Sequence, residues 1–391
     1  REFDMLQRFL RTTAFGFLAT VSLSCFACLW DKDTLSMERQ RFPSVLELIT
    51  GTFLRHSNEF YRWRVEDRKT KIEVQATPDL FDDLAVAYEK LGETDNAIRV
   101  INQKSVLFPG LYSTHANLGT FYIHAGRLKE GLMEIDTALA INPEAHFGRE
   151  VHQKRLVEYL LSRDPDGQSN LPLSGTKLAG MSTGGFAKFL LMTDGEDLAK
   201  GERNELLDKA IEGVLGMMKF GNYDSPVLLE VLGDLLLSRQ FPSDAKRLAA
   251  RAYLKASYHS QDLDGQEAYR GKAKACLRFQ SRGEGTTKEL PIDELETQFA
   301  EELKRATVWR QSIVDQEMKW IRAGVNVDKA FDEKYYEEPE ATVVEASAAS
   351  GRTTLWGVVV IVSLMGTLCI GMSYWKMRAR NNHPIPHHQD A

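Results

Sequence analysis

Residues 78–111 read PDLFDDLAVAYEKLGETDNAIRVINQKSVLFPGL, and residues 112–145 read YSTHANLGTFYIHAGRLKEGLMEIDTALAINPEA. The two stretches superimpose without a gap, at a period of 34 residues. The matched positions are Leu84 with Leu118, Ala85 with Gly119, Tyr88 with Tyr122, Gly92 with Gly126, Ala97 with Gly131, Ile101 with Ile135 and Pro109 with Pro143. A fixed period of this length indicates a stack of repeated units, and the apolar spacing predicts two helices in each unit.

Each matched pair has a physical role in such a helical hairpin. The small residues let the two helices approach closely, while the Tyr and Ile pairs fill the space beside them. The Gly pair at 92 and 126 suits the turn, because glycine adopts a left-handed conformation without a Cβ penalty. The Pro pair interrupts the second helix and begins the next unit. Since one unit cannot bury its apolar face alone, the units must stack.

With this pattern the chain resembles the tetratricopeptide repeat (TPR) family. The family motif is a Leu-Gly/Ala pair, a Tyr three residues on, a turn Gly, a small residue in the second helix and a closing Pro. A third, degenerate copy spans 226–259, with Leu232 and Gly233 at the pair but Gln240 at the turn and Ser257 at the proline. The resemblance implies an all-α fold, a TPR-like helical-hairpin solenoid.

The resemblance also implies a binding groove. In the family, the inner helix of each unit lines a concave groove that receives a peptide or helix of a partner. The corresponding positions here are Asp79, Asp82, Val86, Glu89, Ser113, Ala116, Thr120, Ile123, Val227, Glu230 and Asp234. The family's carboxylate-binding subset carries Lys, Arg and Asn there, and this chain has none, so capture of an acidic C-terminal peptide is disfavoured. We expect an acidic groove with apolar patches that binds a basic or amphipathic protein segment.

Two apolar stretches predict contact with a membrane. Residues 353–375 are 23 consecutive uncharged residues, and a helix of this length reaches about 34 Å, enough to cross a bilayer core of roughly 30 Å. Basic residues follow within 376–380, so we expect a cytoplasmic tail and an extracytoplasmic repeat domain. A second uncharged run, 12–30, follows a basic start. It is either a signal peptide cleaved after Ala27 or a second membrane anchor.

The remaining stretches complete the predicted organisation. In order, it is a signal peptide or N-terminal anchor at 1–30, a helical N-cap region at 31–77, two TPR units plus a following helix at 78–163, a turn-rich loop at 164–200, degenerate TPR-like helices at 201–281, a long amphipathic helix at 288–336, a stalk at 337–352, the transmembrane helix at 353–375 and a cytoplasmic tail at 376–391. In the N-cap region, Arg62, Arg64 and Arg68 interleave with Tyr61 and Trp63. We expect a helix that packs its aromatic rings on the first repeat and leaves the arginines in water, with contact to phosphate or lipid headgroups as the alternative.

The predicted long helix carries one continuous apolar stripe. Its residues recur every seven positions, at Ile292, Phe299, Ala306, Ile313 and Trp320. Such a stripe either caps the end of the solenoid or forms a coiled-coil seam between two chains. The polar Glu302 and Gln316 in the second row favour capping.

Composition and motifs argue against several functions. The chain has 49 Lys+Arg and 55 Asp+Glu, a net charge of −6, without the cationic surplus of a nucleic-acid binder. No P-loop, dinucleotide glycine pattern or zincin pair occurs, so we expect no enzyme activity, no cofactor and no metal. The string from Gly180 to Gly184 fits the G-x-S-x-G elbow of serine hydrolases, with Ser182 as nucleophile and His259 or His383 as base. No predicted strand precedes it, as that elbow requires.

These patterns favour a membrane-anchored, non-enzymatic adaptor that binds a protein or peptide partner through its solenoid. Two alternatives stay open. The chain is a serine hydrolase that uses Ser182, or it is a structural membrane protein. In the second case Ser363, Thr367 and Gly371 form a small-xxx-small row through which the membrane helix makes a homodimer.

Overall fold

Helices make up nearly all of the chain that the structure describes. The computed structural model describes residues 31–33, 41–143, 149–163, 171–174, 185–239, 244–260, 263–280, 287–289 and 291–336. The helices are α3 (Val45–Thr50), α4 (Asn58–Val74), α5 (Pro78–Lys90), α6 (Thr94–Leu107), α7 (Tyr112–His124), α8 (Leu128–Ile141), α9 (Arg149–Arg163), α10 (Gly185–Thr193), α11 (Lys200–Met217), the π-helical turn η2 (Met218–Asn222), α12 (Pro226–Arg239), α13 (Ala245–His259), α14 (Leu263–Cys276), α15 (Ile292–Arg322) and α16 (Val327–Tyr335). Two short strands, β1 (Arg278–Gln280) and β2 (Thr287–Glu289), pair antiparallel. The predicted all-α class is confirmed.

The 34-residue units form the helical pairs α5/α6 and α7/α8. Gly92 and Gly126 stand at the turns with φ of 77° and 75°. Close contact within the second pair depends on glycine, because a Cβ on Gly119 would lie 2.7 Å from Ile135 Cδ1. A Cβ on Gly131 would lie 2.9 Å from the Gly119 carbonyl oxygen. The small residues therefore set the distance between the two helices.

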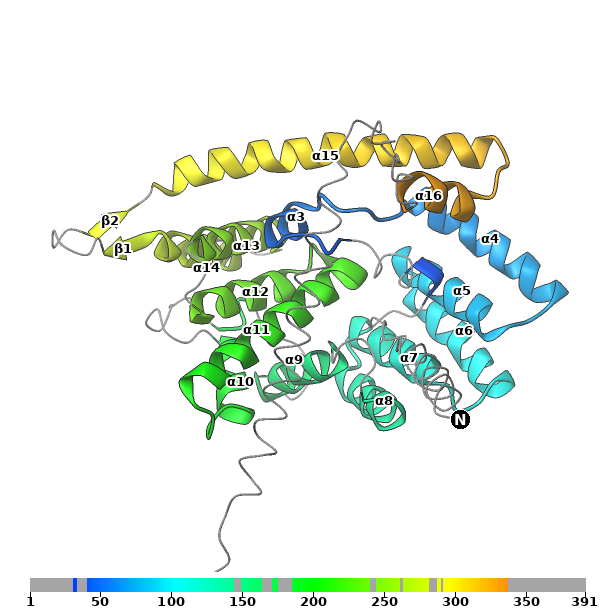
Figure 1. The fold of residues 1–391 in the computed structure, drawn as a ribbon, viewed down its shortest axis with the longest axis horizontal. Coiled ribbons are helices and arrows are strands. Elements are labelled where there is room, and N and C mark those ends of the chain that lie inside the picture. The colour runs from blue at the N-terminus through cyan, green and yellow to red at the C-terminus, as the bar shows by residue number, and fades with distance from the viewer. Residues whose placement is uncertain are drawn as a thin grey trace, which may run out of the picture. The chain divides into compact units, whose positions relative to one another are not determined.

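The third repeat-like stretch forms the pair α12/α13, in which a glycine again lets the two helices pack closely. A Cβ on Gly233 would lie 2.6 Å from the ring of Tyr253, which is fully buried. Figure 1 shows how the pairs follow one another around an arc, from α4 and α5 through α7 and α9 to α12 and α13.

The helix α15 spans the open side of this arc (Figure 1). Near its start, Glu302 accepts two hydrogen bonds of 2.8 Å from Arg251 on α13. Near its end, Glu317 contacts His56 Nδ1 at 2.6 Å and accepts a 2.9 Å bond from the Ser57 backbone N–H ahead of α4. Gln316 accepts a 2.8 Å bond from Lys334 on α16. Both polar residues of the second row thus have partners in the same chain.

The apolar stripe of α15 also packs on the same chain. Phe299, Ala306 and Ile313 are buried, and Ile292 and Trp320 are partly buried. The stripe could pack within its own chain or form a seam between two chains, and in this structure it packs within its own chain. The helix differs from a simple end cap because it contacts α13, α3 and α4 along its length.

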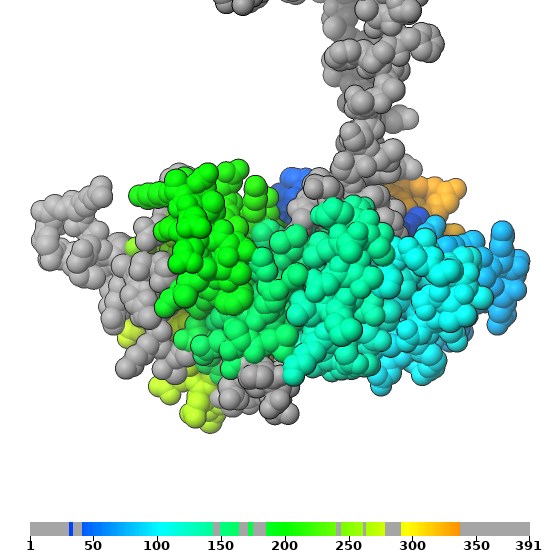
Figure 2. All heavy atoms as spheres, turned by 90° about the horizontal axis from the view of Figure 1, so that it is seen from below, coloured from blue at the N-terminus to red at the C-terminus, as the bar shows by residue number. Residues whose placement is uncertain are grey.

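Two apolar cores divide the described residues. One fills the space among α9 to α15 together with α3, and the other lies among α4 to α7. Figure 2 shows one face of this domain, with the helices in sequence order from the blue and cyan of α4 to α6 to the green of α10 and α11. The boundary between the two cores is where the candidate site lies.

Several predictions fall outside the described residues. They concern the segments 1–30 and 353–375, the stalk and tail, Ser182, His383, and the row of Ser363, Thr367 and Gly371. Within the ranges that are described, no helix combines the length and the apolar character that crossing a bilayer requires.

Candidate functional site

A cavity of about 770 Å³ lies between the two apolar cores. Residues of α5, α7 and α9 line it together with residues of η2 and the start of α12. The segment 53–61, Asp31, Asp33 and Arg310 of α15 also contribute to the lining. We call this space the inner cavity. It is formed by the first helices of successive hairpins, the helices that the TPR resemblance assigns to a groove.

Five of the predicted groove residues line the inner cavity. They are Val86, Glu89, Thr120, Ile123 and Val227. Asp79 is exposed at the start of α5 and does not line the cavity. The other five, Asp82, Ser113, Ala116, Glu230 and Asp234, are buried inside the helix packing.

Asp82 belongs to a buried ion pair. Lys104 on α6 approaches both of its carboxylate oxygens, at 2.7 and 2.6 Å, and also donates to Ser113 Oγ at 2.6 Å. Asn117 donates a further 2.9 Å bond to Asp82. The expectation that Asp82 and Ser113 face an open groove is therefore wrong. Asp82 and Ser113 lie on α5 and α7, which line the cavity, but both side chains contact Lys104 on the neighbouring helix α6.

Glu230 and Asp234 are likewise structural. Glu230 contacts Lys272 on α14 at 2.6 Å and accepts bonds from the Leu173 and Ser174 backbone N–H groups at 2.8 and 3.0 Å. Asp234 accepts a 2.6 Å bond from Tyr253. These contacts hold the short stretch 171–174 against α12 and α14. The predicted acidic groove loses three of its carboxylates in this way, because Asp82, Glu230 and Asp234 are neutralised or hydrogen-bonded in the interior.

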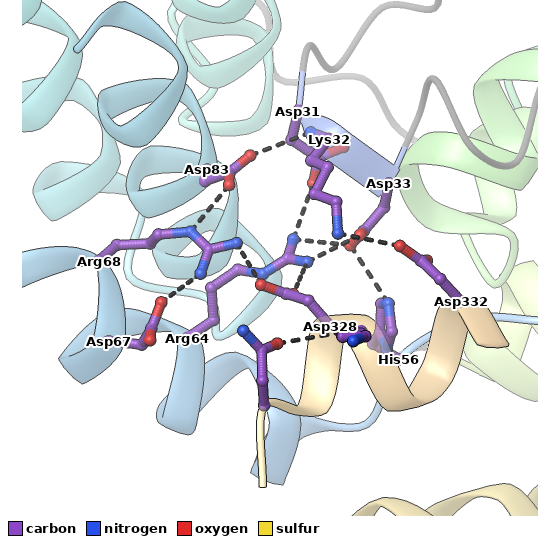
Figure 3. A network of polar contacts seen from close by, with 12 residues as sticks. Asp31, Lys32, Asp33, His56, Arg64, Asp67, Arg68, Asp83, Asp328 and Asp332 are labelled. Atoms are coloured by element: carbon purple, nitrogen blue, oxygen red, sulfur yellow. Dashed lines mark hydrogen bonds and ion pairs between the residues drawn. The ribbon is translucent and has the colours of Figure 1, made fainter. Parts of the chain in front are cut away.

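Two acidic groups outside the predicted groove positions also have a cationic partner. Asp31 and Asp33 line the inner cavity, and Figure 3 shows how they converge on the buried Arg64. Arg64 lies 3.3 Å from Asp31 and 2.6 Å from Asp33. Burial acts to raise the pKa of Asp33, but Arg64 and His56 outweigh it and hold that pKa well below its usual value.

The same network ties α16 to α4. Arg64 and Arg68 both bind Asp328, the first at 2.6 Å, and Arg68 also bonds Asp83 at 2.8 Å (Figure 3). The prediction that these arginines stay in water is wrong, because Arg64 and Arg68 are 0% and 3% exposed. Sequence reasoning missed this, since Asp328 is 264 residues away from Arg64 in the chain.

The cationic residues of the inner cavity come from outside the predicted groove positions. Arg55, Lys90, Lys219 and Arg310 line it. Lys90, at the end of α5, donates to the Phe220 and Gly221 carbonyl oxygens of η2 at 2.5 and 2.8 Å. Burial lowers the pKa of Lys90 to about 8, and repulsion by Arg55 acts in the same direction.

Arg55 and Arg310 also bind uncharged acceptors. Arg55 donates to the Gly51 carbonyl oxygen at 2.6 Å and to the Tyr223 hydroxyl at 2.9 Å. Arg310 donates to the carbonyl oxygens of Arg55 and His56. Burial lowers the pKa of Arg310, and repulsion by Arg55 adds to the effect. The cavity therefore holds a group of cations on the side formed by η2, α15 and the segment before α4.

Three buried side-chain oxygens of the lining, Asp33 Oδ2, Glu89 Oε2 and Gln153 Oε1, accept no hydrogen bond from the described residues, although Asp33 Oδ2 lies 2.6 Å from Arg64 in an ion pair. The orientation of the Gln153 amide follows from its neighbour. Thr120 donates its hydroxyl proton to the Ala116 carbonyl oxygen at 3.1 Å, so Thr120 accepts from Gln153 Nε2 at 3.2 Å. The Gln153 oxygen is thus the free acceptor of this amide. Beside it, Leu156, Val157 and Leu160 of α9 form an apolar wall.

The proposed base of a hydrolase does not lie at this site. His259 does not line the inner cavity and lies 3.8 Å from Asp224. Comparison of the chain with protein-family models and with curated proteins finds no match.

Proposed function

We propose that this chain is a non-enzymatic adaptor with a TPR-like arrangement of helical hairpins, and that its inner cavity binds a segment of a partner protein. The observation that carries the proposal is the wall built by α5, α7 and α9. These consecutive first helices place Val86, Glu89, Thr120 and Ile123 on one cavity. In the TPR family the same helices receive the partner.

The dimensions and lining of the cavity support this proposal. A volume of about 770 Å³ lies within the range of roughly 300–1,000 Å³ found for ligand sites. The lining combines an apolar wall on α9 with a few polar groups, which is the usual composition of a specific binding site. Two or three side chains of a partner segment fit this space.

We also propose that a helix at 353–375 tethers the domain to a membrane. Among the described residues, Lys32 follows the first apolar run and Asp332 precedes the second, and the two form an ion pair at 2.9 Å. The described residues Lys32 and Asp332 are therefore neighbours in the fold. Removing residues 353–391 should move the protein from the membrane fraction to the soluble fraction if 353–375 is the sole anchor. Retention in the membrane fraction would assign anchoring to residues 12–30.

Site-specific photo-crosslinking in cells tests the adaptor proposal. A photoreactive phenylalanine analogue replaces Val227 or Ile123, both partly exposed in the cavity, and Met133 on the outer face of α8, which is 69% exposed, serves as control. We expect discrete crosslinked polypeptides from the two cavity positions and not from Met133. If the cavity positions crosslink nothing that Met133 does not, the cavity is not a protein-binding site.

A further inference from the structure

Three cations of the inner cavity are partly buried. In the part of the chain that the structure describes, Arg55, Lys90 and Arg310 contact carbonyl oxygens and one hydroxyl, and none of the three contacts a carboxylate. By contrast, the buried Arg64, Lys104 and Lys272 each have at least one carboxylate partner. Charged side chains removed from water are normally paired. The three cavity cations therefore differ from the structural ones.

The three cations line the same cavity. Arg55 repels both Lys90 and Arg310, while Asp31 and Glu89 attract Lys90 and Glu317 attracts Arg310. Like charges gathered in a partly enclosed space are costly, and an anion bound among them removes that cost. Each of these carboxylates is shared with another group, because Asp31 and Asp33 bind Arg64, Glu89 contacts His124 at 2.7 Å and Glu317 contacts His56 at 2.6 Å.

The rest of the lining indicates what carries the anion. The free oxygen of Gln153 requires an N–H or O–H donor, which a peptide backbone supplies and a fatty-acid chain does not. The apolar wall of Leu156, Val157 and Leu160 requires apolar side chains. An anion, backbone donors and apolar side chains occur together in a polypeptide segment.

A side-chain carboxylate fits better than a chain terminus. The groove positions that the TPR resemblance assigns carry no Lys, Arg or Asn, the residue types that the family's carboxylate-binding subset uses there. The cavity cations come from other places in the fold: Lys90 at the end of α5, Arg310 on α15 and Arg55 before α4. None of them is at the start of an inner helix.

We infer that the inner cavity binds an internal segment of a partner protein through an Asp or Glu side chain, with Arg55, Lys90 and Arg310 around the carboxylate and flanking apolar side chains against α9. This inference rests on the proposed adaptor function and names its partner class. It differs from the expectation of a basic partner, because three of the acidic groups behind that expectation, Asp82, Glu230 and Asp234, are buried inside the helix packing.

Fluorescence anisotropy with the 391-residue chain tests this inference. The probe is a labelled pool of nonapeptides, acetylated and amidated at the ends, with a central Glu flanked by randomised Leu, Ile, Val and Phe and by Ser-Gly ends. A matched pool has a central Gln. We expect the Glu pool to bind at least about tenfold more tightly, as a charge-assisted contact predicts. A third pool has the central Gln and a free C-terminal carboxylate, and we expect it to bind as weakly as the Gln pool.

Variants connect the preference to the cavity. In Lys90→Gln the preference for Glu should fall to about threefold or less, whereas Lys90→Arg, which keeps the charge, should retain it. Lys209→Gln is the control, because Lys209 is exposed on α11 and does not line the cavity. Thermal melts followed by circular dichroism verify that each variant is folded.

Four outcomes would overturn the inference. Equal binding of the Glu and Gln pools would remove the anionic contact, while leaving the crosslinking test of the adaptor function unaffected. Tightest binding of the free-carboxylate pool would assign the cations to a chain terminus. No binding of any pool would exclude a short acidic segment as the ligand. Palmitate that binds with the same dependence on Lys90, while the peptides do not, would make the cavity a lipid site.

Discussion

Replacing Lys104 by Met should destabilise the domain strongly, because it leaves Asp82 buried without its cation. Lys104 and Asp82 are 0% and 1% exposed, and their charged atoms lie 2.6 Å apart. Removal of one partner of a buried ion pair costs about 3–5 kcal/mol. For a domain of this size, that loss lowers the melting temperature by roughly 6–20 °C.

The loss should depend on pH in a defined direction. Burial raises the pKa of Asp82 to about 7, against the opposing attraction of Lys104. A carboxyl whose pKa is higher in the folded state than in the unfolded state favours folding at low pH, and this contribution disappears as the pH rises through the folded pKa. Without Lys104 the charged carboxylate becomes still less favourable. The deficit of Lys104→Met should therefore be larger at pH 8.5 than at pH 5.5.

Urea denaturation of the wild type and the variant at the two pH values measures this difference. Lys129→Met, at an exposed position on α8, is the matched control and should change the free energy of unfolding by no more than about 0.5 kcal/mol. The double variant Asp82→Leu with Lys104→Met should recover most of the stability, since no buried charge remains. A loss below about 1 kcal/mol at both pH values, or a double variant no better than the single one, would refute the assignment of Asp82 to a buried structural pair.

Three further predictions concern packing and acid stability. Gly131→Ala should cost about 1–3 kcal/mol, because the new Cβ would lie 2.7 Å from Ile123 Cγ1; thermal melts should show no such loss for Gly201→Ala, which meets open space in α11. Phe299→Ala should lower the free energy of unfolding by about 3–5 kcal/mol. Val308→Ala, at a position 68% exposed on the same helix, should change it very little. A change of oligomeric state with Phe299→Ala would instead indicate that the stripe forms a seam between chains. Burial opposes ionisation of Asp328, but Arg64 and Arg68 hold its pKa at about 2, so its contribution is present above pH 4 and is lost as the pH falls toward 2. Asp328→Asn should accordingly lower stability at pH 6 and flatten the loss between pH 4 and pH 2 in acid titrations, and a variant with the wild-type acid profile would contradict this assignment.

The helical pairs could be predicted from the sequence because their signals are local. The period of 34 residues places Gly92 and Gly126 at turns and small residues at Gly119 and Gly131, and each of these positions needs only its neighbours along two adjacent helices. The seven-residue stripe of α15 is local in the same sense. The helices that cover this stripe could not be predicted, because an apolar stripe shows that a helix is packed but does not identify the surface against which it packs.

The charge of the candidate site could not be predicted, because it depends on contacts between distant segments. Asp82 stands at a position of α5 that the repeat pattern assigns to the groove, but Lys104 on the next helix forms an ion pair with it. Arg310 reaches the cavity from a position 255 residues beyond Arg55. No repeat pattern includes either arginine. A register argument therefore places Asp82 on a helix that lines the cavity, but it cannot show which distant side chains pair with it.

The position of α15 has a consequence for how the site responds to a ligand. A stack of hairpins in which each unit touches only its neighbours changes curvature by adding small rotations from unit to unit. Here a helix of 31 residues contacts α13 near one end of the arc and α4 at the other. Any bending of the arc must also shift this rod against both ends. We therefore expect α15 to resist a change in the width of the cavity, so that a bound segment would need little ordering of the protein and its affinity would depend mainly on its contacts.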